Sequence, residues 1–263
     1  MSKTNENILQ PKDFIFEKYN PTKFTGDSGA LLLATSKYDK NVQYVVKHTY
    51  PECACNEFMY YQIATELGLS VPTVKLFEIS DDDLKYFKSS IAVGIEYIPH
   101  SKRYLGDNNG IINHSDFFAF FALVVVLNEE DSFEIIVDAD NRLYKIDNSA
   151  SFGISMAHAA GAAMFNDLDK QNQDIITALL KRSAEFTEYD KYRIQHDILL
   201  EKYGEEATKH FLNLIKDFSE LDETKFDDAF ELISHFYNEI LGDYYCYFIQ
   251  NRKAECSRFL NEI

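Results

Sequence analysis

The first third of the chain alternates short apolar stretches with turn residues, a pattern typical of β-strands. Leu, Val, Ile and Tyr dominate four such stretches, which lie at 30–35, 42–48, 74–79 and 90–98. Between the second and the third of them, apolar residues recur at helical spacing over 51–69, and Gly68 stands where a C-terminal cap is expected. The pattern therefore predicts a strand-rich region that contains one helix.

After a polar connection at 100–114 the pattern becomes mostly helical. The segment 117–127 is apolar on every side, which predicts a helix that is buried all round. Two short apolar stretches, 134–137 and 143–146, flank a turn rich in Asp and Asn and predict a β-hairpin. Helical spacing returns in five later segments, at 174–184, 194–203, 205–217, 225–241 and 244–260.

These patterns predict an α+β chain of two lobes. The strand-rich lobe is expected at 1–98 and the mostly helical lobe at 99–263. A chain of 263 residues with 46% apolar content can bury a core without disulfides or a metal. Its four cysteines are too few for a disulfide framework and include no second pair at zinc spacing, so we expect reduced thiols in a cytoplasmic protein.

The net charge of −17 narrows the classes of partner. Binding to nucleic acid or to anionic membranes requires clustered Lys and Arg, so we expect neither. The N-terminus carries no apolar segment of the secretory type, and the longest apolar run is too short for a membrane helix. A cytoplasmic location follows as an expectation, with delivery as an effector left open.

Small residues and one Lys–Glu pair are the first candidates for chemistry. Gly26, Ser28 and Gly29 form a turn whose backbone amides could approach phosphate oxygens, although most such turns are only turns. Lys47 ends an apolar strand, and Glu57 lies early in the following helix. Such a pair could aim an ammonium group at phosphates, whereas spacing alone favours a surface ion pair of little energetic weight.

The second group of candidates follows the apolar helix. An acidic loop occupies 128–132, and Asp147 closes the predicted hairpin. Loops that are held by a rigid helix and a hairpin are where metal ligands and a catalytic base can be positioned. The alternative is a solvated helix end, although negative charge is unfavourable at a helix C-terminus.

The segment 128–147 resembles the catalytic loop and metal-binding hairpin of phosphatidylinositol 3- and 4-kinases and of HipA-type protein kinases. That pattern reads Asp-Arg-His-x-x-Asn-Ile, two hydrophobic residues, a turn, and then hydrophobic-x-Ile-Asp. The residues at 135–137 and 143–147 match it. The segment 44–69 is similar to the ATP-anchoring strand and first helix of HipA-like kinases, and 93–98 resembles their hinge.

The resemblance implies a bilobal protein-kinase-like fold and an ATP- and Mg²⁺- or Mn²⁺-dependent Ser/Thr protein kinase of HipA-like type. A protein substrate is then expected, and a cognate regulatory or antitoxin-like partner would fit. Lys47 would hold phosphates and Glu57 would orient Lys47. The remaining nucleotide-binding positions would be the turn and the hinge, namely Gly26, Ser28, Gly29, Glu96 and Ile98.

The chain departs from the family pattern in the catalytic loop. Acidic residues at 129–131 replace its Asp-Arg-His, and Glu134 replaces the metal-binding Asn. We predict Asp131 as the base or substrate-orienting group, with Glu129 as the alternative, and Asp147 with Glu134 as metal ligands. The missing Arg and His leave two other functions open, a pseudokinase without turnover and a small-molecule phosphotransferase.

Overall fold

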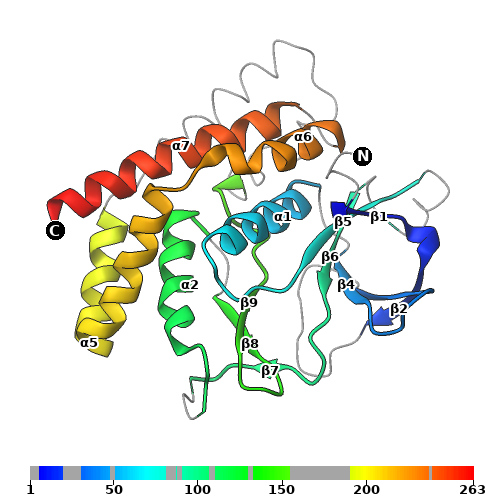
Figure 1. Ribbon diagram of the computed structural model, residues 1–263, viewed down its shortest axis with the longest axis horizontal. Helices are drawn as coiled ribbons and strands as arrows, with labels where there is room; N and C mark the ends of the chain where they lie inside the picture. The colour runs from blue at the N-terminus through cyan, green and yellow to red at the C-terminus, as the bar shows by residue number, and fades with distance from the viewer. Residues whose placement is uncertain are drawn as a thin grey trace.

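Six strands form the larger sheet of the computed structural model (Figure 1). The structure describes residues 6–19, 31–47, 51–80, 87, 91–106, 110–129, 133–154, 190–236 and 239–263. The strands of this sheet are β1 (Ile8–Leu9), β2 (Phe14–Tyr19), β3 (Leu31–Ser36), β4 (Gln43–Lys47), β5 (Val74–Glu78) and β6 (Ile91–Glu96). Their order is β1-β5-β6-β4-β3-β2, and only the β1–β5 pair is parallel.

Helix α1 (Pro51–Glu66) joins this sheet to the rest of the molecule. Pro51 occupies the first turn, where its missing N–H costs nothing. Gly68 adopts a φ of 73° and donates its N–H to the Thr65 carbonyl, which confirms the predicted cap. The helix contacts β5, β6 and α6 (Asp227–Phe236), so it lies inside one continuous apolar core rather than on a surface.

The second part of the molecule is mostly helical and carries a small sheet. Strands β7 (Lys102–Arg103), β8 (Glu134–Val137) and β9 (Leu143–Ile146) pair in that order. The remaining elements are α2 (His114–Val126), α5 (Asp190–Ser219), the short 3-10 helices η2 (Pro11–Asp13) and η3 (Glu223–Phe226), and α7 (Glu239–Glu262). Figure 1 shows α2 between α5 and the β8–β9 hairpin, with α6 and α7 crossing above α1.

The predicted α+β class, with strands and one helix first and mostly helices afterwards, is confirmed. The four predicted strands, the first helix and the hairpin all form, and no end moves by more than three residues. The break between the helices at 194–203 and 205–217 also forms, because Gly204 has a φ of 78° inside α5. The helix predicted at 174–184 lies outside the described residues.

Several details of the prediction were wrong. Strands β1, β2 and β7 were missed; two of them are only two residues long and are defined by their pairing partners. Helix α2 is not buried all round, since Phe117, Phe121 and Val125 are only half-buried. The predicted break near 242 does not occur: Gly242 lies within α7, where it allows α6 to approach closely. Nowhere in the described ranges is a helix both long and apolar enough to span a bilayer.

A glycine in the central strand β6 tests this packing. An added Cβ at Gly94 would lie 2.5 Å from Cε2 of the Phe77 ring and 3.3 Å from Cβ of Tyr44. We therefore expect Gly94→Ala to lower the free energy of unfolding by ~1–3 kcal/mol, which denaturant titration measures. The same substitution in a Phe77→Leu background should cost less, because the ring that it meets is gone. Equal costs in both backgrounds would contradict this packing.

Candidate functional site

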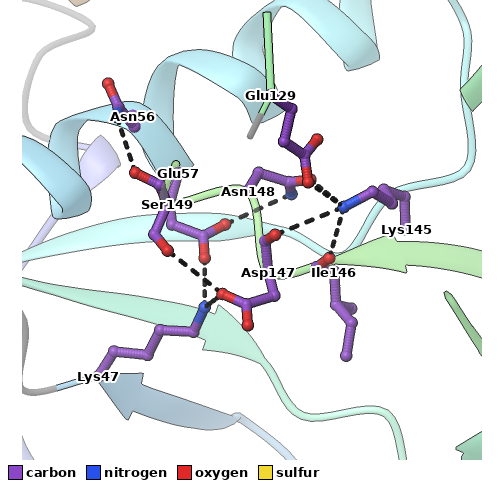
Figure 2. Close-up of polar contacts among 9 residues, drawn as sticks. All are labelled: Lys47, Asn56, Glu57, Glu129, Lys145, Ile146, Asp147, Asn148 and Ser149. Carbon is purple, nitrogen blue, oxygen red and sulfur yellow. Dashed lines mark hydrogen bonds and ion pairs between the residues drawn. The ribbon is translucent and has the colours of Figure 1, made fainter. Parts of the chain in front are cut away.

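The ammonium group of Lys47 joins two consecutive elements, β4 and α1, to the loop after β9, which lies 100 residues further along the chain (Figure 2). Its Nζ donates to Oε1 of Glu57, and to Oδ1 of Asp147 at 2.6 Å. Lys47 ends β4, Glu57 lies in the second turn of α1, and Asp147 directly follows β9. The structure thus brings these three predicted residues together. The Lys47–Glu57 contact is not the surface ion pair that spacing favoured, because the Glu57 side chain is 1% exposed.

Strand alternation explains why Lys47 points toward α1. Tyr44 and Val46 are buried in a second apolar cluster, with Phe14 and Phe77, on one face of the sheet. Lys47 therefore projects from the opposite face. That face is the one that α1 covers through its contacts with β5 and β6. The alternation of residues along β4 thus places the Lys47 ammonium against α1, the helix that supplies Glu57.

The three charges change one another's ionisation. Burial lowers the pKa of Lys47, but the carboxylates of Glu57 and Asp147 outweigh it and hold this pKa above its ordinary value. The Lys47 ammonium lowers the pKa of the Asp147 carboxyl against the opposing effect of burial. Lys47 and Asp147 are therefore both charged at neutral pH. The Asp147 side chain keeps 33% of its surface exposed, so its carboxylate remains accessible to solvent.

Two asparagines hold the Asp147 loop against α1. The side-chain amide of Asn56 donates to the Ser149 carbonyl at 2.7 Å, and Tyr245 of α7 donates its hydroxyl to Oδ1 of Asn56 at 2.7 Å. Asn148 donates from Nδ2 to Oε2 of Glu57 at 3.4 Å. Asp147 itself has a φ of 60°, in the left-handed region that Asp tolerates better than most residues. Neighbouring side chains therefore fix the loop and the helix relative to each other.

Lys145 is the important residue that sequence reasoning missed. It is fully buried, and its Nζ lies 2.8 Å from Oε1 of Glu129 and 2.9 Å from Oδ1 of Asn148. A signal was available: Lys145 alternates with the apolar Leu143 in β9, so strand periodicity puts a charge on the buried face. The argument that a lysine among buried strand residues requires a partner applies here as it does to Lys47.

Besides Asp147, the structure describes two of the predicted catalytic and metal-binding residues, Glu129 and Glu134. The Glu129 side chain is fully buried beside Lys145; burial raises the pKa of Glu129 to about 7, although the Lys145 ammonium opposes this shift. Its buried, paired position does not suit a base that must meet a substrate hydroxyl. Glu134 is the first residue of β8 and pairs with Ile146, the residue that precedes Asp147 in the sequence. The other predicted positions, Asp131, Gly26, Ser28 and Gly29, lie outside the described residues.

The predicted hinge residues lie at the end of β6. The Glu96 N–H donates to the Thr73 carbonyl at 2.7 Å, and the Glu96 carboxylate accepts the Thr73 N–H at 2.9 Å. The Ile98 carbonyl accepts the Ser101 N–H at 3.4 Å. The segment therefore leads directly from the large sheet to β7. Its contact with adenine stays a prediction.

The oxygen donors fit a magnesium site that is completed by phosphates. Within the described ranges no group of three or more His, Cys, Asp or Glu side chains could hold a metal ion by itself. Mg²⁺ is usually bound by one or two carboxylates, water and substrate phosphates rather than by a protein cage. The partly exposed Asp147 carboxylate suits that mode. Glu134, which pairs with Ile146 across the hairpin, stays a predicted second ligand.

Comparisons with known proteins give little beyond this geometry. No family model matches the sequence, and no curated protein matches it. Among solved structures, the chain is similar to the crystal structure of a Helicobacter pylori proinflammatory kinase, CtkA. The TM-score is 0.48 and the sequence identity is 14%, over 93% of this chain and 97% of that one.

The ion pair between Lys47 and Asp147 predicts a specific acid titration. Because the folded pKa of Asp147 is lowered, its carboxylate stabilises the fold above its unfolded pKa of about 3.9, and this contribution disappears as pH falls through the folded pKa. Lys47→Met should raise the pKa of Asp147, since burial remains and the attraction is lost. Carbon-detected NMR titration measures this pKa, and Asp147→Asn identifies the signal.

A control for this titration exists at the far end of α1. Lys225 pairs with Glu66 there, and the Lys225 side chain is 52% exposed. Lys225→Met also removes one Lys–carboxylate contact of α1, but it should leave the Asp147 titration unchanged. An Asp147 pKa that is the same in wild type and Lys47→Met would show that the pair does not form in solution.

The hydroxyl of Tyr245 provides a stability test of the loop anchor. Tyr245→Phe leaves the buried Oδ1 of Asn56 without its donor, so we expect a loss of ~1–3 kcal/mol in the free energy of unfolding. Tyr38→Phe is the matched control, because the Tyr38 hydroxyl bonds Asp13 at the surface and its loss should be negligible. Denaturant titration compares the two. Equal effects would argue against a buried hydrogen bond at Asn56.

Proposed function

We propose that the chain is an ATP-dependent phosphotransferase that transfers the γ-phosphoryl group to a Ser or Thr hydroxyl of a protein. The observation that carries this proposal is the position of Lys47 between Glu57 of α1 and Asp147 after β9. In protein kinases a strand lysine contacts the phosphates, a helix glutamate orients that lysine, and an aspartate holds Mg²⁺. The same residue types meet here from the same kinds of element.

Each member of the trio has a chemical role in this proposal. The Lys47 ammonium carries three N–H groups and gives two of them to Glu57 and Asp147, so a third remains to donate to a phosphate oxygen. Glu57, buried and bonded also to Asn148, fixes the direction in which the ammonium points. Mg²⁺ bound at Asp147 would neutralise charge on the transferring phosphoryl group.

The proposal also names an acceptor and a base. A protein hydroxyl is a better acceptor than an anionic lipid, because a net charge of −17 does not attract the chain to anionic membranes. A base must reach that hydroxyl. Glu129 is committed to Lys145 in a fully buried pair, so Asp131 is the base in this proposal.

The burial of Glu129 also supports a second candidate function, nucleotide binding without turnover. In the family pattern that the loop resembles, the position of Glu129 holds the catalytic Asp, and in this chain it is an internal ion pair. A protein that keeps Lys47, Glu57 and Asp147 but lacks a working base would bind nucleotide and transfer nothing. The two functions differ only in turnover, so one set of variants separates them.

Thermal unfolding with ligand tests the nucleotide site. ATP with Mg²⁺ at about one hundred times its dissociation constant should stabilise the chain by roughly 2.7 kcal/mol, a shift of several degrees in Tm. Lys47→Met should abolish this shift, because the phosphate contact is lost, and Asp147→Asn should abolish its dependence on Mg²⁺. Lys225→Met, which breaks the exposed Lys225–Glu66 pair, should keep the full shift.

Transfer is then measured with γ-labelled ATP and a mixture of protein substrates. Label on protein that disappears in Asp131→Asn and Asp147→Asn supports the phosphotransferase. A Mg²⁺-dependent Tm shift without any transferred label would support nucleotide binding without turnover. The absence of a Tm shift with either Mg²⁺ or Mn²⁺ would contradict both functions.

A further inference from the structure

A second buried ammonium group lies beneath the proposed phosphate site. The Lys145 side chain is 0% exposed, as is that of its partner Glu129, whereas Lys47 keeps 17% of its surface exposed. A buried ammonium must be fully paired to be tolerated. The Lys145 ammonium is too deeply buried to contact a substrate. Any role in the site must therefore act through the residues that it binds.

The acceptors of Lys145 indicate that role. Its Nζ lies 2.8 Å from the Ile146 carbonyl, 3.4 Å from the Asp147 carbonyl and 2.9 Å from Oδ1 of Asn148 (Figure 2). These three oxygens belong to consecutive residues, and the middle residue is the proposed metal ligand. The fourth acceptor, Glu129 Oε1 at 2.8 Å, comes from the segment after α2.

The backbone at Asp147 needs such support. Its φ of 60° lies in the left-handed region, which Asp tolerates better than most residues but which still costs free energy, so surrounding contacts must offset that cost. Lys145 collects the carbonyl oxygens on both sides of the Asp147 Cα. The ammonium therefore holds the turn that directs the Asp147 carboxylate back toward Lys47.

The same contacts link the two ammonium groups. Asn148 accepts from Lys145 through Oδ1 and donates through Nδ2 to Glu57, which binds Lys47. Two residues, Asn148 and Glu57, thus connect Lys145 to Lys47 through hydrogen bonds. A change at Lys145 reaches Asp147 through the backbone, and it reaches Lys47 through Asn148 and Glu57.

We infer that Lys145 is a positioning residue that sets the direction of the Asp147 carboxylate and thereby the affinity of the site for a divalent cation. This inference rests on the proposed function. Groups that orient metal ligands from outside the coordination sphere typically change metal affinity by 10–100-fold when they are removed. Glu129, in turn, supplies the charge that allows Lys145 to be buried.

The test must separate this role from a purely structural one. Lys145→Met alone would strand the buried Glu129 carboxylate, and Glu129→Gln alone would strand the buried Lys145 ammonium. The informative variant is therefore Lys145→Met/Glu129→Gln, compared with the wild type, because neither protein contains an unpaired buried charge at these positions. Thermal unfolding without ligand reports on the fold, and calorimetric titration with ATP, with and without Mn²⁺, reports on the site.

We expect the double variant to fold and to bind metal-free ATP as the wild type does, because Lys47 and Glu57 remain. It should bind ATP with Mn²⁺ 10–100-fold more weakly than the wild type does. Binding within twofold of the wild type would overturn the positioning role and leave the proposed function standing. Wild type that shows no Mn²⁺-dependent nucleotide binding would instead overturn the proposed function, and the inference with it.

A second measurement needs no variant and decides the matter if the double variant does not fold. A crystal structure of the wild type with Mn²⁺ and a non-hydrolysable ATP analogue shows whether Lys145 keeps its carbonyl partners when the site is loaded. Nζ within hydrogen-bond distance of the Ile146 carbonyl, with Asp147 still at positive φ and bound to the metal, supports the inference. A Lys145 side chain that leaves this carbonyl while Asp147 binds the metal overturns it.

Discussion

The need to neutralise buried ammonium groups constrains this structure more than any other interaction. Lys47 enters the interior at the end of an apolar strand, and the two carboxylates that balance it come from α1 and from the loop after β9. The Glu57 side chain is almost fully buried, so leaving either charge unpaired would be strongly unfavourable. The ends of three elements must therefore meet at one point. Lys145 imposes the same constraint a short distance away, with Glu129.

Helix α1 connects that constraint to the apolar core. Phe58, Met59 and Ile63 belong to the large core that also contains residues of α2, α5, α6 and α7. On the same helix, Asn56 and Glu57 are buried but polar, and they bind the Asp147 loop and Lys47. A shift of α1 would therefore disturb core packing and the charged site together. Packing of the helical region against α1 thus supports the geometry at Lys47, with the Tyr245 hydroxyl as one direct link.

The acidic loop shows how far local sequence can mislead. Glu129 follows an apolar helix, and a negative charge there is unfavourable in the field of the helix, which made a catalytic role attractive. Its actual partner is Lys145, sixteen residues further on in β9, and the pairing buries both side chains completely. The negative charge of Glu129 is therefore neutralised by a contact with a distant lysine, and it is not available to a substrate. An acidic residue without a visible local partner therefore indicates either function or a distant cation, and the loop sequence contains no information to separate them.

The sequence by itself determined most of the elements and the three residues that meet at Lys47. Period-two and helical patterns are local, so they located β3 to β6, α1 and the hairpin, and the spacing of Lys47 and Glu57 from strand to helix anticipated their pairing. Asp147 was found because it closes the hairpin. The tertiary structure alone decided which charges are buried, since burial depends on what covers a residue from elsewhere in the chain. The tertiary structure therefore showed that Glu129 is a buried partner of Lys145 rather than a group that meets substrate. It also showed that Lys145, Asn148 and Tyr245 support the residues around Lys47.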